Sequence, residues 1–216
     1  MKPENFTTLT KLELEAMAKA LPHMSVKEKM ELFDDLELRE SRAKLQAAKT
    51  NMLGFAQAVY PGFKIGPHHK KLAKIFTDVV EGRKKRVIIN IAPRMGKSEF
   101  SSYLFPAYFL GKYPEKKIIM GTHTASLSED YGRRVRNLID SEEYHEIFPN
   151  TLVASDQKAA GKWSTTAGGQ YYAAGVGGAL AGRGADLFVI DDPHSEQTAM
   201  SNSGFEDAWD WYTGGP

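Results

Sequence analysis

The sequence predicts an α/β protein with a mainly parallel central sheet flanked by helices, preceded by a helical appendage. Two apolar runs, 86–91 and 187–190, have the length of buried strands, and polar residues suited to ligand chemistry follow each of them. Helical patterns and a third strand-like run at 117–120 lie between them, which is the order typical of α/β folds. We place the appendage at 1–50 and the core domain at 51–216.

Two helices separated at Pro22 are expected in the appendage. The second begins with Ser25 and Glu28, which have the spacing of a capping box. Its apolar residues fall on one face, namely Val26, Met30, Phe33 and Leu36. We expect this stripe to be buried, either on the core or on a partner.

The core domain opens with a helix that ends at Gly82, because glycine is common directly after a helix. The apolar residues of this helix are Leu72, Ile75, Phe76, Val79 and Val80. The basic run Arg83-Lys84-Lys85-Arg86 follows. We interpret it as a solvated turn, with a nucleic-acid contact as the alternative.

The segment Pro93-Arg94-Met95-Gly96-Lys97-Ser98 directly after the first apolar run resembles a phosphate-binding loop. Backbone N–H groups at a helix N-terminus attract phosphate, and glycine lets the backbone come close. Lys97 would lie between the β- and γ-phosphates, and the Ser98 hydroxyl would bind magnesium. Ile91 replaces the usual first glycine, so an ordinary turn between a strand and a helix is the alternative.

The next elements follow from the spacing of apolar residues. A helix from Lys97 onward is expected from Phe100, Tyr103, Leu104, Ala107 and Tyr108, with Pro106 kinking or shortening it. After the strand at 117–120, a second helix would bury Leu127, Tyr131, Val135 and Leu138. Its solvent side would carry Arg133, Arg134 and Arg136.

The glycine-rich stretch 161–184 predicts turns rather than a second phosphate loop. Trp163 and Tyr171-Tyr172 lie among small and polar residues, which favours an antiparallel hairpin. This hairpin is either a structural edge of the sheet or an inserted loop that tracks DNA.

A second motif follows the apolar run 187–190, which we expect to be a strand buried on both faces. Asp191 comes directly after it, at the end where α/β sheets place ligands, and can hold magnesium beside Ser98. Asp192 can orient the attacking water. An acidic turn without catalytic function is the alternative. Together the two motifs predict a P-loop NTPase that uses ATP and Mg²⁺.

Composition narrows the remaining function classes. The chain contains no cysteine, which rules out disulfides, thiolate metal sites and cysteine catalysis. The longest apolar run, 103–110, is too short to span a bilayer, so no membrane contact is expected. The net charge of +1 does not by itself indicate tight binding of nucleic acid.

From about residue 50 to residue 216, the motifs in their order resemble the ATPase domain of the large terminase subunit of tailed phages. The matching segments are Pro67-His68-His69, 93–99, 117–125, 182–186 and 189–193. The resemblance implies a P-loop ATPase of the ASCE type that drives double-stranded DNA into a procapsid. It also implies a portal protein, a small terminase subunit and self-association into a ring as partners, in the host cytoplasm and outside the mature virion.

The resemblance assigns further residues. Arg94 matches an arginine that stabilises charge on the γ-phosphate, and the catalytic carboxylate is Asp192 or Glu196. Arg183 corresponds to an arginine that acts across the subunit boundary, and pairing with Asp186 is its alternative.

His68 lies where the family contacts adenine, with a plain surface histidine as the alternative. His194, beside the two acids, is interpreted as a loop residue and not as a metal ligand.

We expect the chain to be an ATPase fragment that stops before the coupling strand and the nuclease domain of the family, and therefore to lack nuclease activity. Two rival functions remain open. One is another P-loop nucleic-acid motor such as a helicase-like ATPase, and the other is a module that binds a nucleotide without hydrolysing it.

Overall fold

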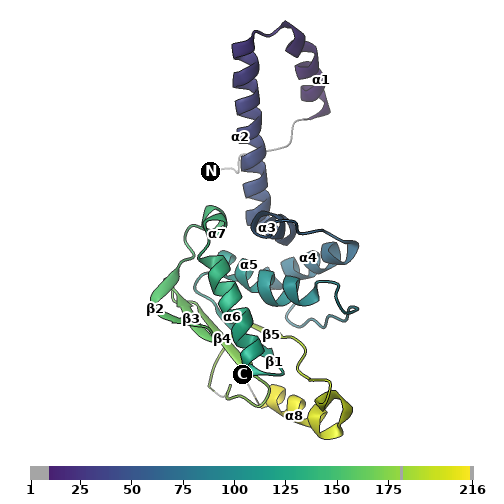
Figure 1. Cartoon of the computed structure of the whole chain (residues 1–216), viewed down its shortest axis with the longest axis vertical. Coiled ribbons are helices and arrows are strands. Elements are labelled where there is room, and N and C mark those ends of the chain that lie inside the picture. Colours follow the sequence, from purple (N-terminus) through teal and green to yellow (C-terminus); the bar gives the residue numbers. More distant parts are fainter. Residues whose placement is uncertain (1–9, 181, 215–216) are drawn as a thin grey trace.

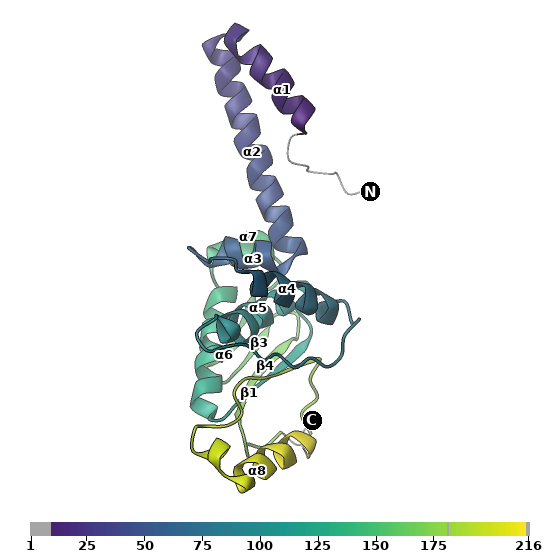
Figure 2. The ribbon, with the colours of Figure 1, turned by 90° about the vertical axis from the view of Figure 1, so that its right-hand side faces the viewer.

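The computed structural model describes residues 10–180 and 182–214. It has a body and an arm of two helices that projects from it (Figures 1 and 2). The arm consists of α1 (Lys11–Ala20), a short 3-10 turn η1 (Leu21–His23) and α2 (Val26–Thr50). The first nine residues of the predicted appendage lie outside the described residues.

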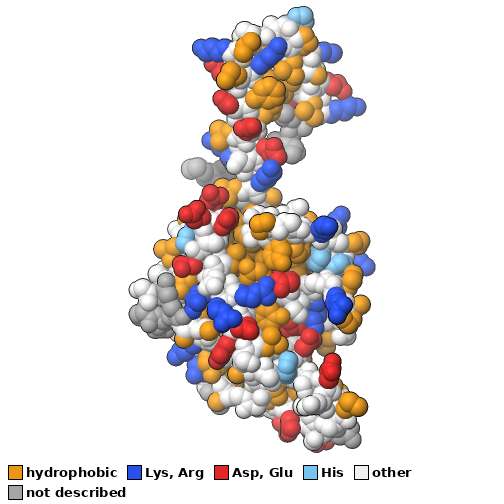
Figure 3. All heavy atoms as spheres, in the orientation of Figure 1, with side chains coloured by type: hydrophobic (Ala, Val, Ile, Leu, Met, Phe, Trp, Pro, Cys, Tyr) orange, Lys and Arg blue, Asp and Glu red, His pale blue; other side chains and the backbone are white. Residues whose placement is uncertain are grey.

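The predicted capping box at the start of α2 is confirmed. The Ser25 hydroxyl accepts a hydrogen bond from the Glu28 amide at 3.3 Å, and the Glu28 carboxylate accepts one from the Ser25 amide at 2.7 Å. The apolar stripe does not dock on the core, because Val26 is 76% and Phe33 57% exposed. Burial of the stripe on a partner stays a prediction. In Figure 3, orange side chains lie among charged ones on the surface of the arm.

The body contains helices on both faces of one sheet (Figure 2). Its helices before the phosphate loop are α3 (Met52–Val59) and α4 (Pro67–Val80), and Gly82 follows α4 with a φ of +72°, as its predicted position requires. Those after the loop are α5 (Phe105–Lys112), α6 (Ala125–Ile139), α7 (Glu142–Ile147), the 3-10 turn η3 (Thr198–Met200) and α8 (Asn202–Thr213).

The sheet has five strands in the order β2-β3-β4-β1-β5. They are β1 (Lys117–Thr122), β2 (Val153–Ala159), β3 (Lys162–Thr165), β4 (Gln170–Gly175) and β5 (Leu187–Ile190). β1 pairs in parallel with β4 and β5, whereas β2, β3 and β4 pair antiparallel. The sheet is therefore mixed and not mainly parallel. The predicted hairpin is its antiparallel half and not an inserted loop.

Alternate residues of β1 point to opposite faces, as the pleat of a strand requires. Ile118 and Met120 join the large core under α5 and α6, and Ile119 packs with Trp211 of α8 on the other face. β5 forms one edge of the sheet, and three of its four residues are only half-buried. The prediction of a strand there is confirmed. Its two faces pack on the two hydrophobic clusters, Leu187 and Val189 on one and Phe188 and Ile190 on the other, but only Leu187 is buried rather than half-buried, so the predicted burial is confirmed in part.

The run 86–91 is neither helix nor strand, so the strand predicted before the phosphate loop is wrong. Ile88 is 91% exposed and Val87 36% exposed. An apolar run can form a strand only where another strand accepts its backbone hydrogen bonds, and the described sheet ends at β5 without pairing to this segment.

The helix predicted after the loop is present, but it is divided. Its first part, η2 (Glu99–Leu104), is a π-helix in which the Phe105 amide donates to the Phe100 carbonyl. Pro106 follows in the first turn of α5 and has no N–H to continue an α-helical ladder. The proline therefore divides the helix, as predicted, and π-helical turns of this kind are frequent at functional sites.

Candidate functional site

The phosphate-loop segment lies between α4 and η2 and has a strained backbone. Gly96 has a φ of +75°, a conformation that favours glycine, and Arg94 has a φ of +62° without being glycine. A side chain at position 96 would also come within 3.2 Å of His69 Nε2. Glycine is thus required at position 96 for both backbone conformation and space.

Lys97, on the first helical turn after the loop, lies between the two carboxylates that follow β5. Its Nζ atom is 3.0 Å from Asp191 Oδ1 and 2.5 Å from Asp192 Oδ1. Burial opposes the charge on Lys97, but the hydrogen bonds to Asp192 and Asp191 outweigh it, so the pKa of Lys97 is raised. The structure therefore unites the two motifs, which are more than 90 residues apart in the chain.

Asp191 is the anchored member of the acid pair. It is only 6% exposed, its amide donates to the Gly121 carbonyl of β1, and its Oδ2 accepts a 2.8 Å hydrogen bond from Ser102. Asp192, in contrast, has a side chain that is 65% exposed and a backbone φ of +45°. A strained residue next to a buried carboxylate is typical of sites where geometry serves function.

Two contacts fix the first turn after the loop. Tyr131 of α6 lies beside Ser98, and burial raises the pKa of the Tyr131 hydroxyl. Arg134 of α6 donates to both Glu99 oxygens, at 2.8 and 2.6 Å, and stacks on Tyr103 with 4.3 Å between the guanidinium and the ring centre. The helix register predicted that Arg134 faces solvent. This prediction is wrong, because Arg134 forms part of the wall of the site.

Several predicted site residues are exposed beside this centre. Pro93, Arg94 and Met95 are exposed in the loop, as is Glu196. In the described part of the chain, no hydrogen bond or ion pair joins Glu196 to Lys97 or Asp191.

Arg183 does not pair with Asp186, so that alternative is wrong. Its guanidinium lies 3.9 Å from the centre of the Tyr172 ring. Asp186 instead pairs with Lys116 at 2.8 Å and accepts a hydrogen bond from the Lys117 amide.

The histidine pair at the start of α4 contacts the loop. His68 Nε2 lies 3.0 Å from the Met95 carbonyl oxygen and 3.2 Å from His69 Nε2. The Gly66 amide donates to His69 Nδ1, and burial together with the neighbouring His68 lowers the pKa of His69. His68 is thus placed against the phosphate loop, while His69 is buried beneath Gly96.

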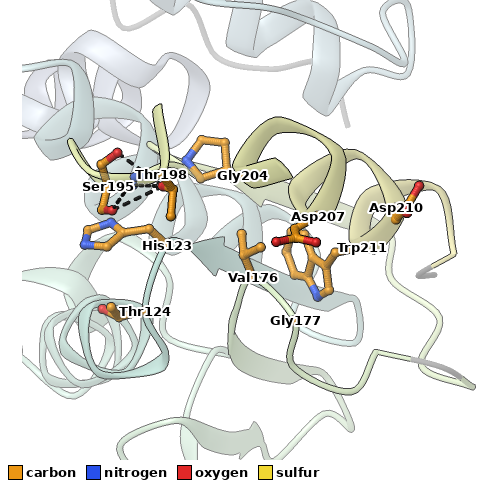
Figure 4. Close-up of a pocket in the computed structure, with 11 residues that line it drawn as sticks. His123, Thr124, Val176, Gly177, Ser195, Thr198, Gly204, Asp207, Asp210 and Trp211 are labelled. Atoms are coloured by element: carbon orange, nitrogen blue, oxygen red, sulfur yellow. Dashed lines mark hydrogen bonds between the residues drawn. The ribbon is translucent and has the colours of Figure 1, made fainter. Parts of the chain in front are cut away.

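A cavity of about 590 Å³ opens beside the acid pair, at the carboxyl ends of β1 and β4 (Figure 4). Its lining includes His123, Ser195, Thr198, Asp207 and Trp211. His123 Nδ1 is buried without a hydrogen-bond partner in the described part of the chain. His194, predicted to be a loop residue, packs on Phe205 with 4.6 Å between the ring centres.

The donor atoms fit a hard cation and phosphate. A serine hydroxyl and a buried carboxylate are oxygen ligands of the kind that Mg²⁺ prefers. The ion usually keeps several bound waters in addition to its protein ligands. Ser98 and Asp191 would hold Mg²⁺, and the hydrogen bond from Ser102 orients the Asp191 carboxylate. Within the described residues, no group of three or more His, Asp or Glu forms a complete metal cage.

Sequence reasoning missed Ser102, Tyr131, Arg134 and His69. Ser102 could have been found, because it follows Ser98 by one helical turn and shares its face. Glu99 and Arg134 are 35 residues apart and their pairing depends on how α6 packs, which no local pattern reports.

The fold and the site define an α/β protein with a mixed sheet, in which a lysine after a glycine-containing loop faces two carboxylates at the end of a parallel strand. The chain belongs to the terminase large subunits: the sequence model of the T4likevirus-type terminase large subunit, N-terminal region, matches residues 88–201. The predicted resemblance is confirmed. No curated protein and no solved structure matches the chain.

Membership of this family suggests a role in packaging phage DNA, with an ATPase type of chemistry and with DNA and packaging proteins as partners in general. In the described part of the chain, no helix is both long enough and apolar enough to cross a membrane.

Proposed function

We propose that this chain is the ATPase part of a DNA-packaging motor of the P-loop, ASCE type, which hydrolyses ATP with Mg²⁺ to move double-stranded DNA into a procapsid. The observation that carries the proposal is the position of Lys97, which follows a glycine-containing loop and reaches both Asp191 and Asp192. Membership of the terminase family supports the assignment of this lysine and acid pair to an ATPase of the packaging type.

Each residue of the site has a role in this proposal. Gly96 and Lys97 bind the phosphates through backbone N–H and ammonium groups. Ser98 and Asp191 hold Mg²⁺, which when bound neutralises charge on the β- and γ-phosphates. Arg94 is exposed in the loop and therefore free to reach the γ-phosphate.

The ion pairs of Lys97 imply an exchange of partners. Lys97 would leave the carboxylates for the phosphates, which would free Asp191 for magnesium and Asp192 for the attacking water. Asp192 suits this role because its side chain is largely exposed and its conformation is strained. Glu196 remains the alternative base, since it lies in the exposed loop four residues beyond Asp192.

The proposal extends to the surroundings of the site. His68 would contact the adenine base, and its position against the loop, 3.0 Å from the Met95 carbonyl, supports this role. Arg183 would act on a neighbouring subunit of a ring, and its exposure, with the guanidinium stacked on Tyr172, supports this role. The partners would be double-stranded DNA, a portal protein and a small terminase subunit, within the host cytoplasm and not in the mature virion.

One observation favours a second candidate, a module that binds a nucleotide without hydrolysing it. Lys97 occupies both carboxylates in the present arrangement, so neither acid is available for magnesium or water until the lysine moves.

Phosphate release from ATP and Mg²⁺ tests the proposal, measured with and without double-stranded DNA. We expect Lys97→Ala and Asp191→Ala each to lower turnover by about 10²-fold or more, because each removes charge stabilisation at the phosphates. Lys19→Ala is the control, since this exposed lysine lies on the arm. Stimulation by DNA supports the motor, and strand separation would instead indicate a helicase-like ATPase. ATP binding without any turnover would overturn the proposal in favour of the binding module.

A further inference from the structure

The charge of this chain is strongly uneven along its length. Residues 64–86 carry eight Lys and Arg against two Asp and Glu, a formal charge of +6, whereas the whole chain carries only +1. The remaining residues therefore carry −5. The net charge of the whole chain is near zero although one segment, which comprises α4 and the residues on either side of it, is strongly basic.

The basic side chains of α4 share its solvent face. Lys70, Lys71 and Lys74 are exposed. The opposite face is buried in the core and comprises His69, Leu72, Ala73, Phe76 and Val80. Blue side chains lie on the flank of the body that α4 forms (Figures 1 and 3). We call Lys64, Lys70, Lys71, Lys74, Lys85 and Arg86 the α4 stripe.

The only acids of this segment are already neutralised. Asp78 pairs with Arg83 at 2.6 Å and with Lys84 at 3.7 Å, and Glu81 also pairs with Arg83. These pairs hold the pKa of Asp78 below its usual value, mainly through the hydrogen bond from Arg83. Among the described residues, Lys70, Lys71 and Lys74 form no such ion pair, so their charge is available to a partner.

The residue types of the α4 stripe favour duplex nucleic acid over a membrane surface or a single strand. A membrane-binding helix needs an apolar face to insert, but the apolar face of α4 is inside the core. A single-strand site needs aromatic side chains on which bases stack, and the described solvent face of α4 offers lysines instead. Lysines contact phosphates as point charges and carry no sequence information, which suits a duplex of any sequence.

The stripe also has a direct structural connection to the candidate site. The first turn of α4 contains His68, whose Nε2 lies 3.0 Å from the Met95 carbonyl, and His69, which lies beneath Gly96. With a rise of 1.5 Å per residue, α4 is about 21 Å long, which corresponds to about six base pairs of duplex. One rigid helix thus has a basic outer face and an end that touches the phosphate loop.

We propose that the α4 stripe binds the phosphate backbone of double-stranded DNA and that α4 connects this contact to the phosphate loop. The inference rests on the proposed packaging function, for which it names the surface of the chain that meets DNA. For Lys85 and Arg86 it adopts a nucleic-acid contact, the alternative to the solvated turn, whereas Arg83 and Lys84 pair with Asp78.

Binding of the full chain to a 30-base-pair duplex tests this inference over a range of salt concentrations. Each phosphate contact contributes about 0.9 to the slope of log K against log salt. We therefore expect the triple variant Lys70→Gln, Lys71→Gln, Lys74→Gln to lower the slope by about 3 and the affinity at 0.1 M salt by on the order of 10²-fold. The matched control, Lys11→Gln, Lys19→Gln, Lys27→Gln, removes three exposed lysines from the arm and should leave both quantities unchanged.

A crosslinking experiment locates the contact directly, because the chain has no cysteine of its own. Lys74→Cys carrying a photoactivated label should crosslink to duplex DNA, and Lys19→Cys with the same label should not. Duplex stimulation of phosphate release should also fall in the Lys70, Lys71, Lys74 variant, with DNA-independent release retained.

Four outcomes would overturn the inference: no binding of the duplex by the unaltered chain, equal losses in the two triple variants, crosslinking only from the arm, or tighter binding to phosphatidylserine vesicles or single strands than to duplex. Phosphate release separates this inference from the proposed function. Stripe-dependent DNA binding without any turnover supports the stripe and contradicts the ATPase, whereas turnover without DNA binding does the reverse.

Discussion

Two helices of this chain, α2 in the arm and α6 in the body, have similar amphipathic sequences but different surroundings. α2 has 25 residues, of which the described structure buries only Ala48. α6 has 15 residues and buries five, and it contributes Tyr131 and Arg134 to the candidate site. An apolar stripe therefore indicates which face of a helix would be covered, and the neighbouring elements decide whether it is.

The two helices are also stabilised in different ways. α2 relies on local interactions, namely its capping box and exposed pairs four residues apart such as Arg39 with Asp35. α6 is held from outside, because Trp163 Nε1 donates to its Gly132 carbonyl and Ser128 donates to the Ala174 carbonyl of β4. Changes in the body should therefore alter global stability, whereas changes in the arm should act locally.

The largest effect should come from Trp163→Ala in the body. Trp163 is fully buried and stacks on Tyr171 with 5.0 Å between the ring centres. Truncation would leave a cavity, so we expect the free energy of unfolding to fall by about 3–5 kcal/mol in urea denaturation. Trp209→Ala is the control, because Trp209 is 63% exposed, and it should change the free energy of unfolding by less than about 0.5 kcal/mol. Similar losses at both positions would remove the distinction between buried and exposed sites.

A smaller loss is expected from Ser102→Ala at the candidate site. Asp191 would remain buried but lose a hydrogen-bond donor, which typically costs about 1–3 kcal/mol. Ser101→Ala is the matched control, because its hydroxyl donates to the Lys97 carbonyl within the same helix and lies 3.4 Å from the Ser102 hydroxyl, whereas only Ser102 donates to Asp191 among these two serines. Denaturation at pH 7 should show the larger loss for Ser102. A larger loss for Ser101 would mean that Asp191 does not depend on this contact.

Ser25→Ala tests the arm and should act on α2 alone. Loss of a capping side chain costs about 1 kcal/mol of helix stability. We expect amide hydrogen exchange in the first turns of α2 to become about fivefold faster, while the global unfolding midpoint stays constant. Ser41→Ala, at an exposed position inside α2, should not increase exchange, since alanine favours helix. A shift of the global midpoint in Ser25→Ala would show that arm and body unfold together.

The smallest effect should come from Phe33→Ser on the apolar stripe of α2. Phe33 is 57% exposed, so its replacement should change the free energy of unfolding by less than about 0.5 kcal/mol. Phe55→Ser, at a fully buried position of α3, provides the contrast and should cost several kcal/mol. A loss above about 2 kcal/mol for Phe33→Ser would mean that the stripe is covered in solution and would break the comparison.

Much of the fold could be predicted because its signals are local. The capping box at Ser25, the helix end at Gly82 and the strands at 117–120 and 187–190 were all predicted and are confirmed. The order of the motifs was sufficient to indicate the terminase family, which the family match confirms. The two motifs were expected to share one site, and the ion pairs of Lys97 with Asp191 and Asp192 bring them together. Those ion pairs themselves were not predicted.

The remainder depended on partners distant in sequence. The run 86–91 has the composition of a buried strand but pairs with no strand of the described sheet, and Val26, Met30 and Phe33 of the α2 stripe are exposed. Similarly, the roles expected of Arg94, Glu196 and Arg183 stay predictions, because their side chains are exposed in loops whose ligands and neighbours decide their function.

The sequence by itself therefore determined the local elements, the two motifs and the family, since hydrophobic period, capping and turn chemistry act over a few residues. Only the tertiary structure decided that Ser102 orients Asp191, that Arg134 fixes Glu99, and that the lysines of α4 form one exposed basic face. Burial and ion pairing each require two surfaces in contact, and the sequence of a single segment describes only one of those two surfaces.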